Sequence, residues 1–124
     1  MNQAFKISRE QVQGNVTITV LHLQGWLDAQ SEEALLAEAR VVYDEGGRYL
    51  VIDLAEVDTL TSAGMRAIQK VYKLYTPADE HFKVSRVKLC NAPPQVYHVL
   101  GVTGFLQNIP NYENEQAAID SFTG

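Results

Sequence analysis

The feature that most constrains the fold is a short apolar run at positions 49–52, YLVI, in which polar and apolar residues do not alternate. A strand of this composition has both faces buried, as in a parallel sheet covered by helices. A preceding helix is predicted to end at Gly46 and Gly47, and a following one to start near Ser62. Such an order of helix, strand and helix is typical of α/β domains.

The flanking segments extend this pattern. Val16, Ile18 and Val20 alternate with threonines, which indicates a half-buried strand, and Gly14 precedes them as a turn from an earlier strand over 5–8. Further elements are expected as a strand at 84–90, a short helix from 91, a short strand at 105–109 and a last helix over 111–122. We therefore predict one α/β domain over residues 1–124, with a mixed, mostly parallel sheet, an N-terminal β-hairpin and about four helices.

Composition argues against several classes of protein. The formal net charge is −5 and the Lys and Arg residues are scattered, so no nucleic-acid partner is expected. The start of the chain does not resemble a signal peptide and no apolar run could span a bilayer, so we expect a cytoplasmic protein with no membrane partner. Cys90 is the only cysteine, and His22, His81 and His98 share no metal-ligand spacing, so neither a metal nor another cofactor is predicted.

The segment with most chemical information is VIDLAEVDTLTSAGMRAI, residues 51–68. A buried strand is predicted to end at Asp53–Leu54, and the residues Thr61 to Gly64 lead into a helix. Functional groups of open parallel sheets collect at such strand ends. The Ser62 hydroxyl can cap the helix. It can also be a phosphorylation site, because a phosphate anion suits the positive end of a helix.

This segment resembles the STAS domain family, the domain of anti-sigma-factor antagonists. Members carry a strand ending in Asp-Leu and, after a short gap, Asp-Ser-Ser-Gly-Leu at a helix start; here these stand as Asp53–Leu54 and the run from Thr61 to Met65. The run Gly25 to Asp28 looks like the family's Gly-x-Leu/Ile-Asp element, and residues 91–105 look like its third helix and following turn. The resemblance covers nearly the whole chain.

The resemblance implies a function and a set of residues. The family's phosphorylated serine falls on Ser62, with Thr61 as an alternative acceptor. A kinase-type anti-sigma factor would bind the unphosphorylated protein, phosphorylate it and be released, and a phosphatase would reset the switch. The expected partner-binding residues are Gly25, Asp28, Asp58, Leu60, Thr61, Ser62, Gly64 and Met65.

Alternatives remain open. Thr61 and Ala63 replace the family's Asp and second Ser, so a non-phosphorylated scaffold in a larger signalling assembly is the main alternative. A receiver domain with Asp53 as acceptor would need an acidic pair for magnesium after an early strand, and 20–24 contains none. A serine hydrolase would need Gly-x-Ser-x-Gly, but Leu60 stands two residues before Ser62. We therefore predict a binding protein and not an enzyme.

Overall fold

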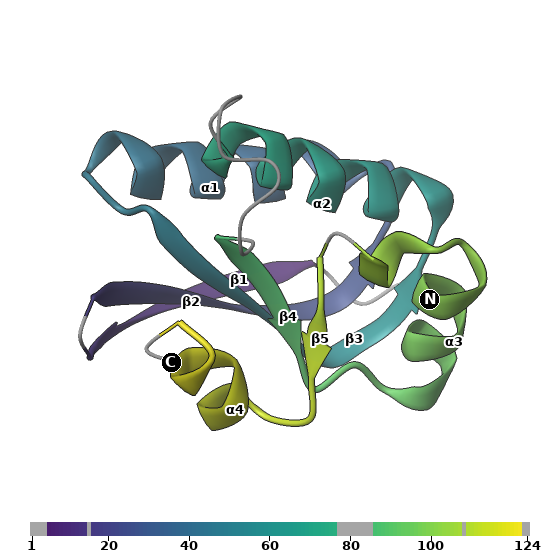
Figure 1. Cartoon of the computed structure of the whole chain (residues 1–124). Helices are drawn as coiled ribbons and strands as arrows, with labels where there is room; N and C mark the ends of the chain where they lie inside the picture. The colour runs from purple at the N-terminus through teal and green to yellow at the C-terminus, as the bar shows by residue number, and fades with distance from the viewer. Residues whose placement is uncertain (1–4, 15, 77–85, 108, 123–124) are drawn as a thin grey trace.

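The computed structural model describes residues 5–14, 16–76, 86–107 and 109–122. In order along the chain, its elements are β1 (Lys6–Gln13), β2 (Thr17–Leu27), α1 (Glu32–Asp44), β3 (Tyr49–Leu60), α2 (Ser62–Tyr75), β4 (Val87–Cys90), α3 (Pro94–Val102), a 3₁₀ turn (Phe105–Gln107), β5 (Asn111–Tyr112) and α4 (Glu115–Asp120). Helices α1 and α2 lie side by side on one face of the sheet, and α4 lies on the other (Figure 1).

The sheet is mixed. Its described strands follow the order β1-β2-β3-β4-β5, so each strand pairs with its neighbour in sequence. The β1–β2 hairpin is antiparallel, whereas the pairs β2–β3, β3–β4 and β4–β5 are parallel. The prediction of a single α/β domain with an N-terminal hairpin, a mostly parallel sheet and four helices is confirmed.

Alternation along β2 divides the core between the two faces of the sheet. Leu21 and Leu23 belong to the larger apolar cluster, which also includes the buried residues of α1 and α2. Ile18 and Val20 point to the opposite face and pack with Ala118 and other residues beneath α4. The sheet therefore separates two layers that carry different side chains. Among the helices in the described residues, none combines the length and apolar character needed to cross a membrane.

Strand β3 is longer than predicted. The expected end at Asp53–Leu54 is wrong, because the strand continues to Leu60. Beyond Asp53, which pairs with Cys90, β3 no longer has β4 beside it and pairs with β2 alone. This half of the strand has an exposed face, so its polar residues Glu56 and Asp58 are compatible with a strand although they look like a loop in the sequence.

The C-terminal elements also differ from the prediction. The strand expected at 105–109 is wrong: Phe105–Gln107 forms a 3₁₀ turn, and the last strand is Asn111–Tyr112. The last helix begins at Glu115 and not at 111, because the Asn114 side chain accepts a hydrogen bond from the Ala117 backbone N–H at 2.8 Å and caps the helix there. Residues 84 and 85 of the strand expected at 84–90 lie outside the described residues.

The two helices of the upper layer are joined by a buried hydrogen bond. The Tyr75 hydroxyl donates to the Ala39 carbonyl oxygen at 2.8 Å, and the ring packs edge-on against Tyr43. Burial raises the pKa of Tyr75, so the hydroxyl stays protonated and able to donate.

We predict that Tyr75→Phe lowers the free energy of unfolding by about 1 kcal/mol. Urea titration measures this, with Tyr97→Phe, half exposed on α3, as the control that leaves stability unchanged. Equal stability of the native protein and Tyr75→Phe would contradict the prediction.

Candidate functional site

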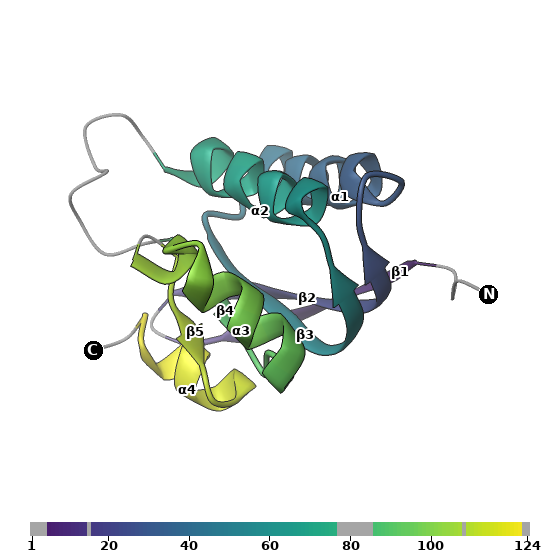
Figure 2. The same ribbon diagram turned by 90° about the vertical axis from the view of Figure 1, so that its right-hand side faces the viewer.

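The predicted site residues lie at one end of the sheet, where β2 leads into α1 and β3 leads into α2. Figure 2 shows both helices starting at this end. The two connections touch through the Leu27 carbonyl oxygen, which accepts a hydrogen bond from the Thr61 backbone N–H at 3.1 Å. Parallel pairing of Leu27 with Leu60 sets this contact. The starts of α1 and α2 are thereby held side by side.

Thr61, and not Ser62, caps α2. The Thr61 side chain accepts a hydrogen bond from the Gly64 N–H at 3.2 Å, and its backbone carbonyl accepts one from Met65. Ser62 is the first residue of the helix and is exposed. Its hydroxyl has no hydrogen-bond partner among the described residues. The N-cap expected at Ser62 is therefore wrong, and no described residue engages its hydroxyl.

Gly64 lets the helix approach Leu27 closely. It is buried, and a Cβ added there would collide with the Leu27 carbonyl oxygen and with the Leu60 side chain. Glycine is needed for this close contact and not for an unusual backbone angle. The family-like glycine thus positions the start of α2.

The turn between β2 and α1 is shaped by Asp28 and Ser31. One oxygen of Asp28 accepts backbone hydrogen bonds from Gln30 at 3.0 Å and Ser31 at 3.3 Å. The Ser31 hydroxyl donates to the Trp26 carbonyl oxygen at 2.9 Å instead of capping α1. Asp28 therefore orders the turn beside the start of α2.

The predicted partner-binding residues fall into two groups. Asp58 and Ser62 are exposed, and Asp28, Thr61 and Met65 are partly exposed. Gly25, Leu60 and Gly64 are buried. Gly25 has a φ of 100° at a register shift between β2 and β3, where glycine is favoured. The buried residues can position this surface but present little of it.

A groove beside Ser62 was not predicted. It has a volume of about 600 Å³ and lies between α2 and the segment that follows α3. Ser62, Met65, Arg66 and Lys73 line it from α2, and Phe105 lines it from the other side. On a helical wheel, Arg66 and Lys73 fall on the same face of the helix as Ser62, so this side of the groove could have been predicted from the sequence. The contribution of Phe105 is a long-range contact that local periodicity does not reveal.

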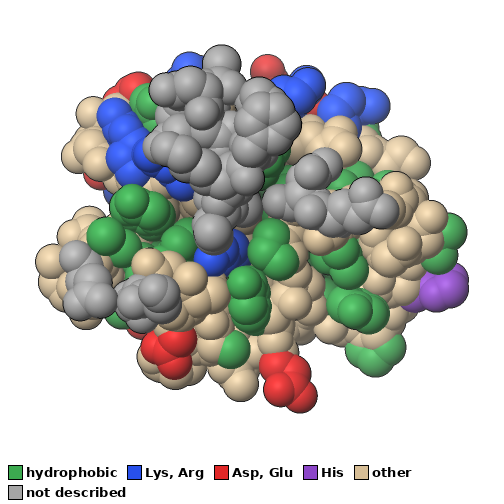
Figure 3. Space-filling view, in the orientation of Figure 1, with side chains coloured by type: hydrophobic (Ala, Val, Ile, Leu, Met, Phe, Trp, Pro, Cys, Tyr) green, Lys and Arg blue, Asp and Glu red, His purple; other side chains and the backbone are tan. Residues whose placement is uncertain are grey.

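Positive charge lies close to the groove. Glu32, at the start of α1, pairs with Lys70 at 2.7 Å and with Arg66 at 3.6 Å. These bases lower the pKa of Glu32, with Lys70 as the main cause. Lys and Arg side chains are visible along the upper edge of the molecule, over α1 and α2 (Figure 3). Glu32 offsets part of the charge of these two bases, whereas the N-terminal end of the α2 dipole favours an anion near Ser62.

Comparison with known proteins identifies the family. The model of the STAS domain matches residues 9–118, so the chain belongs to the STAS domain family. A protein of Bordetella bronchiseptica named "Putative anti-sigma factor antagonist BtrV" is 29% identical over 117 residues, which are 94% of each chain.

Solved structures show the same fold. An anti-sigma factor antagonist from Mycobacterium paratuberculosis superposes with a TM-score of 0.82 at 21% identity, over 98% of this chain and 96% of that one. The anti-sigma factor antagonist SpoIIAA in its unphosphorylated form gives 0.73 at 20% identity, over 96% and 97% of the two chains. The phosphorylated form of SpoIIAA from Bacillus gives 0.66 at 19% identity, over 94% and 99%. The fold is that of the anti-sigma factor antagonists.

The close contact at Gly64 can be tested by adding one methyl group. We predict that Gly64→Ala lowers the free energy of unfolding by about 1–3 kcal/mol, because the methyl group must displace the Leu27 carbonyl. Gly101→Ala is the matched control: it is also in a helix, nothing lies within 4 Å of its added Cβ, and alanine favours helix by up to about 1 kcal/mol.

Chemical denaturation of both variants measures the difference. If Gly64→Ala were as stable as Gly101→Ala, the start of α2 would not depend on this contact.

Proposed function

We propose that this protein acts as an anti-sigma-factor antagonist, binding a kinase-type anti-sigma factor through the surface around the start of α2 and being switched by phosphorylation of Ser62. The observation that carries the proposal is the state of Ser62. It is exposed at a helix start, its hydroxyl has no partner among the described residues, and it borders a groove with basic side chains. The likeness to anti-sigma factor antagonists, one of them solved in a phosphorylated form, supports it.

Ser62 is a better acceptor than Thr61 in this geometry. The Thr61 hydroxyl caps α2 by accepting from Gly64 and lies 3.5 Å from the Leu27 carbonyl oxygen. Phosphorylating it would disrupt the cap and the contact between the two connections. Ser62 can take a phosphate without breaking any hydrogen bond between described residues.

A phosphate on Ser62 should preserve the fold. It would add about two negative charges at the positive end of α2, where anions contribute roughly 0.3–1 kcal/mol of stabilisation. Arg66 lies one helical turn further on the same helix and adds a nearby positive charge. The phosphate should therefore lower the affinity for the partner, because the partner would contact a charged group in place of a hydroxyl.

The remaining parts of the proposal follow from this role. The protein would bind its partner without catalysing a reaction, in the cytoplasm where sigma factors act, and a phosphatase would restore the unphosphorylated state. Thr61 and Ala63, in place of the family's Asp and second Ser, support one alternative: a scaffold of the same fold that is not phosphorylated.

The acceptor can be identified by intact mass after incubation with ATP and the cognate kinase-type anti-sigma factor. We predict one added phosphate on the native protein and on Thr61→Ala, and none on Ser62→Ala. Phosphorylation of Ser62→Ala but not of Thr61→Ala would move the site by one residue. Absence of phosphate on all three proteins would favour the scaffold.

The mode of switching can be tested with charge variants. We predict that Ser62→Asp melts close to the native temperature but binds the anti-sigma factor about 10- to 100-fold more weakly, because desolvating an unmatched charge costs about 1–3 kcal/mol. Ser62→Ala should bind with native affinity. Ser8→Asp is the control, since it makes the same substitution at an exposed position of β1.

Calorimetric melting and binding measurements on the three variants decide the question. Unfolding of Ser62→Asp, or native affinity in that variant, would refute an electrostatic switch at the partner surface.

A further inference from the structure

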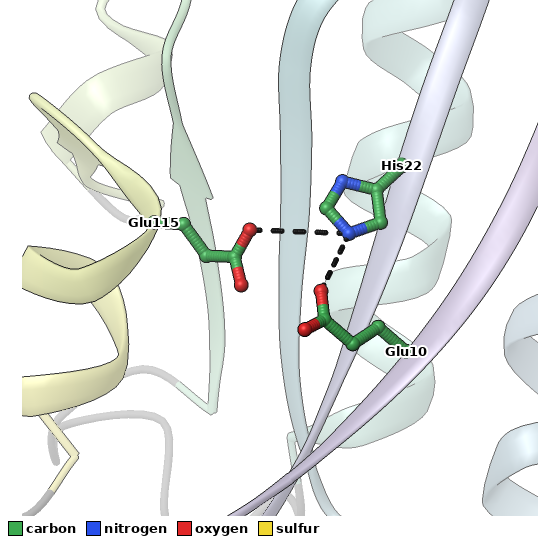
Figure 4. Close-up of side chains that lie close together, drawn as sticks. All are labelled: Glu10, His22 and Glu115. Carbon is green, nitrogen blue, oxygen red and sulfur yellow. Dashed lines mark hydrogen bonds and ion pairs between the residues drawn. The ribbon is translucent and has the colours of Figure 1, made fainter.

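Three potential metal ligands converge on the face of the sheet opposite α2. Glu10 comes from β1, His22 from β2 and Glu115 from the start of α4, and their side chains point toward one another (Figure 4). His22 Nε2 lies 2.8 Å from Glu10 Oε1 and 3.9 Å from Glu115 Oε1. One ligand atom from each residue lies within 4.8 Å of the other two. Segments far apart in the sequence thus meet at one point.

The His22 ring is held in a defined orientation. Its Nδ1 lies 2.7 Å from Asp53 Oδ2, in the neighbouring strand β3. The other oxygen of Asp53 accepts hydrogen bonds from the Ala55 N–H at 3.0 Å and from the Asn91 side chain at 3.1 Å. The Asp53 carboxylate accepts a hydrogen bond from Nδ1, which leaves Nε2 as the nitrogen that a metal would bind, in place of the proton that Nε2 donates to Glu10 in the metal-free protein. A carboxylate that orients a histidine in this way is found beside many histidine ligands of metals.

The cluster has an excess of negative charge. Glu10, Asp53 and Glu115 are three carboxyl groups around one imidazole, and the ion pairs of Glu10 and Glu115 between described residues are with His22 alone. A divalent cation at the point where these side chains meet would offset the repulsion between the carboxylates.

We propose that Glu10, His22 and Glu115 form a binding site for a divalent transition-metal ion, with Zn²⁺ as the best-fitting ion. Imidazole nitrogen and carboxylate oxygen are both zinc ligands, and zinc sites with three protein ligands keep a fourth position for water. In a tetrahedral zinc site, ligand atoms lie roughly 3.4 Å apart, between the two separations measured here from His22 Nε2. Small movements at the ends of these flexible side chains would complete the geometry.

The site is open to solvent. The side chains of Glu10, His22 and Glu115 are 49%, 32% and 30% exposed, so an ion can enter and water can fill the fourth position. The imidazole ligand disfavours Ca²⁺ and Mg²⁺, which prefer oxygen ligands throughout. A bound ion would tie α4 to the hairpin, because its ligands come from α4 and from both hairpin strands. The sequence predicted no metal because these ligands are brought together only by the fold.

The proposal goes beyond the switch at Ser62 and is independent of it, since the two sites lie on opposite faces of the sheet. The proposal can be tested by isothermal titration calorimetry. The full chain is first freed of metal with a chelator and is then titrated with ZnCl₂. We expect saturable binding of one Zn²⁺ and a higher melting temperature with Zn²⁺ present. Glu115→Gln and His22→Gln should each weaken binding at least 10-fold, and His98→Gln, exposed on α3, should bind as the native protein does.

A second variant separates loss of a ligand from loss of its orientation. Asp53→Asn should also weaken Zn²⁺ binding, by about 10- to 100-fold, because the histidine loses the group that orients it. No saturable binding of Zn²⁺, native affinity in both Glu115→Gln and His22→Gln, or equal affinity for CaCl₂ would each overturn the proposal. Failure of these tests would leave partner binding at Ser62 unaffected, and Ser62→Ala should bind Zn²⁺ normally.

Discussion

The arrangement of the candidate site depends on the Leu27 carbonyl oxygen, at the end of β2. It accepts the hydrogen bond of the Thr61 N–H, and it lies so close to Gly64 that a side chain there would not fit. This contact seats α2 against the turn that precedes α1. As a result Thr61 is used as the helix cap and Ser62 is left exposed as the next residue. This one backbone contact therefore places Ser62 at a helix start and beside a groove.

The sheet lets the chain carry two separate arrays of polar groups. On one face, α1 and α2 cover the larger core and present Ser62 beside a groove lined by Arg66 and Lys73. On the other face, the alternation of β2 and β3 turns His22 and Asp53 toward α4. Each array is built on rigid strands and helix starts, where side-chain positions are well defined. Because the layers are distinct, a charge added at one array should have little direct effect on the other.

The order of elements could be predicted from the sequence because it follows from local patterns. The unbroken apolar run 49–52 indicates a doubly buried strand, and glycine, proline and polar residues indicate most helix ends. The end of β3 could not be predicted in this way. Polar residues are tolerated in its outer half because β4 stops at Cys90 and leaves that half without a neighbouring strand on one side. The length of β4 is a property of the sheet and not of the local sequence of β3. Thr61 and Ser62 are both good caps, so only the geometry at Leu27 distinguishes them. Phe105 in the groove and Glu10 beside His22 are contacts between distant segments, which local periodicity does not encode.

The central claim is that the partner binds at the end of the molecule where α2 begins. Hydrogen–deuterium exchange of the protein, alone and in complex with its cognate anti-sigma factor, tests this claim most directly. The account predicts slower exchange in the complex over residues 58–69 and 26–31, and recovery of fast exchange there after Ser62 is phosphorylated. Protection confined to β1 and α4, with none at the start of α2, would contradict it.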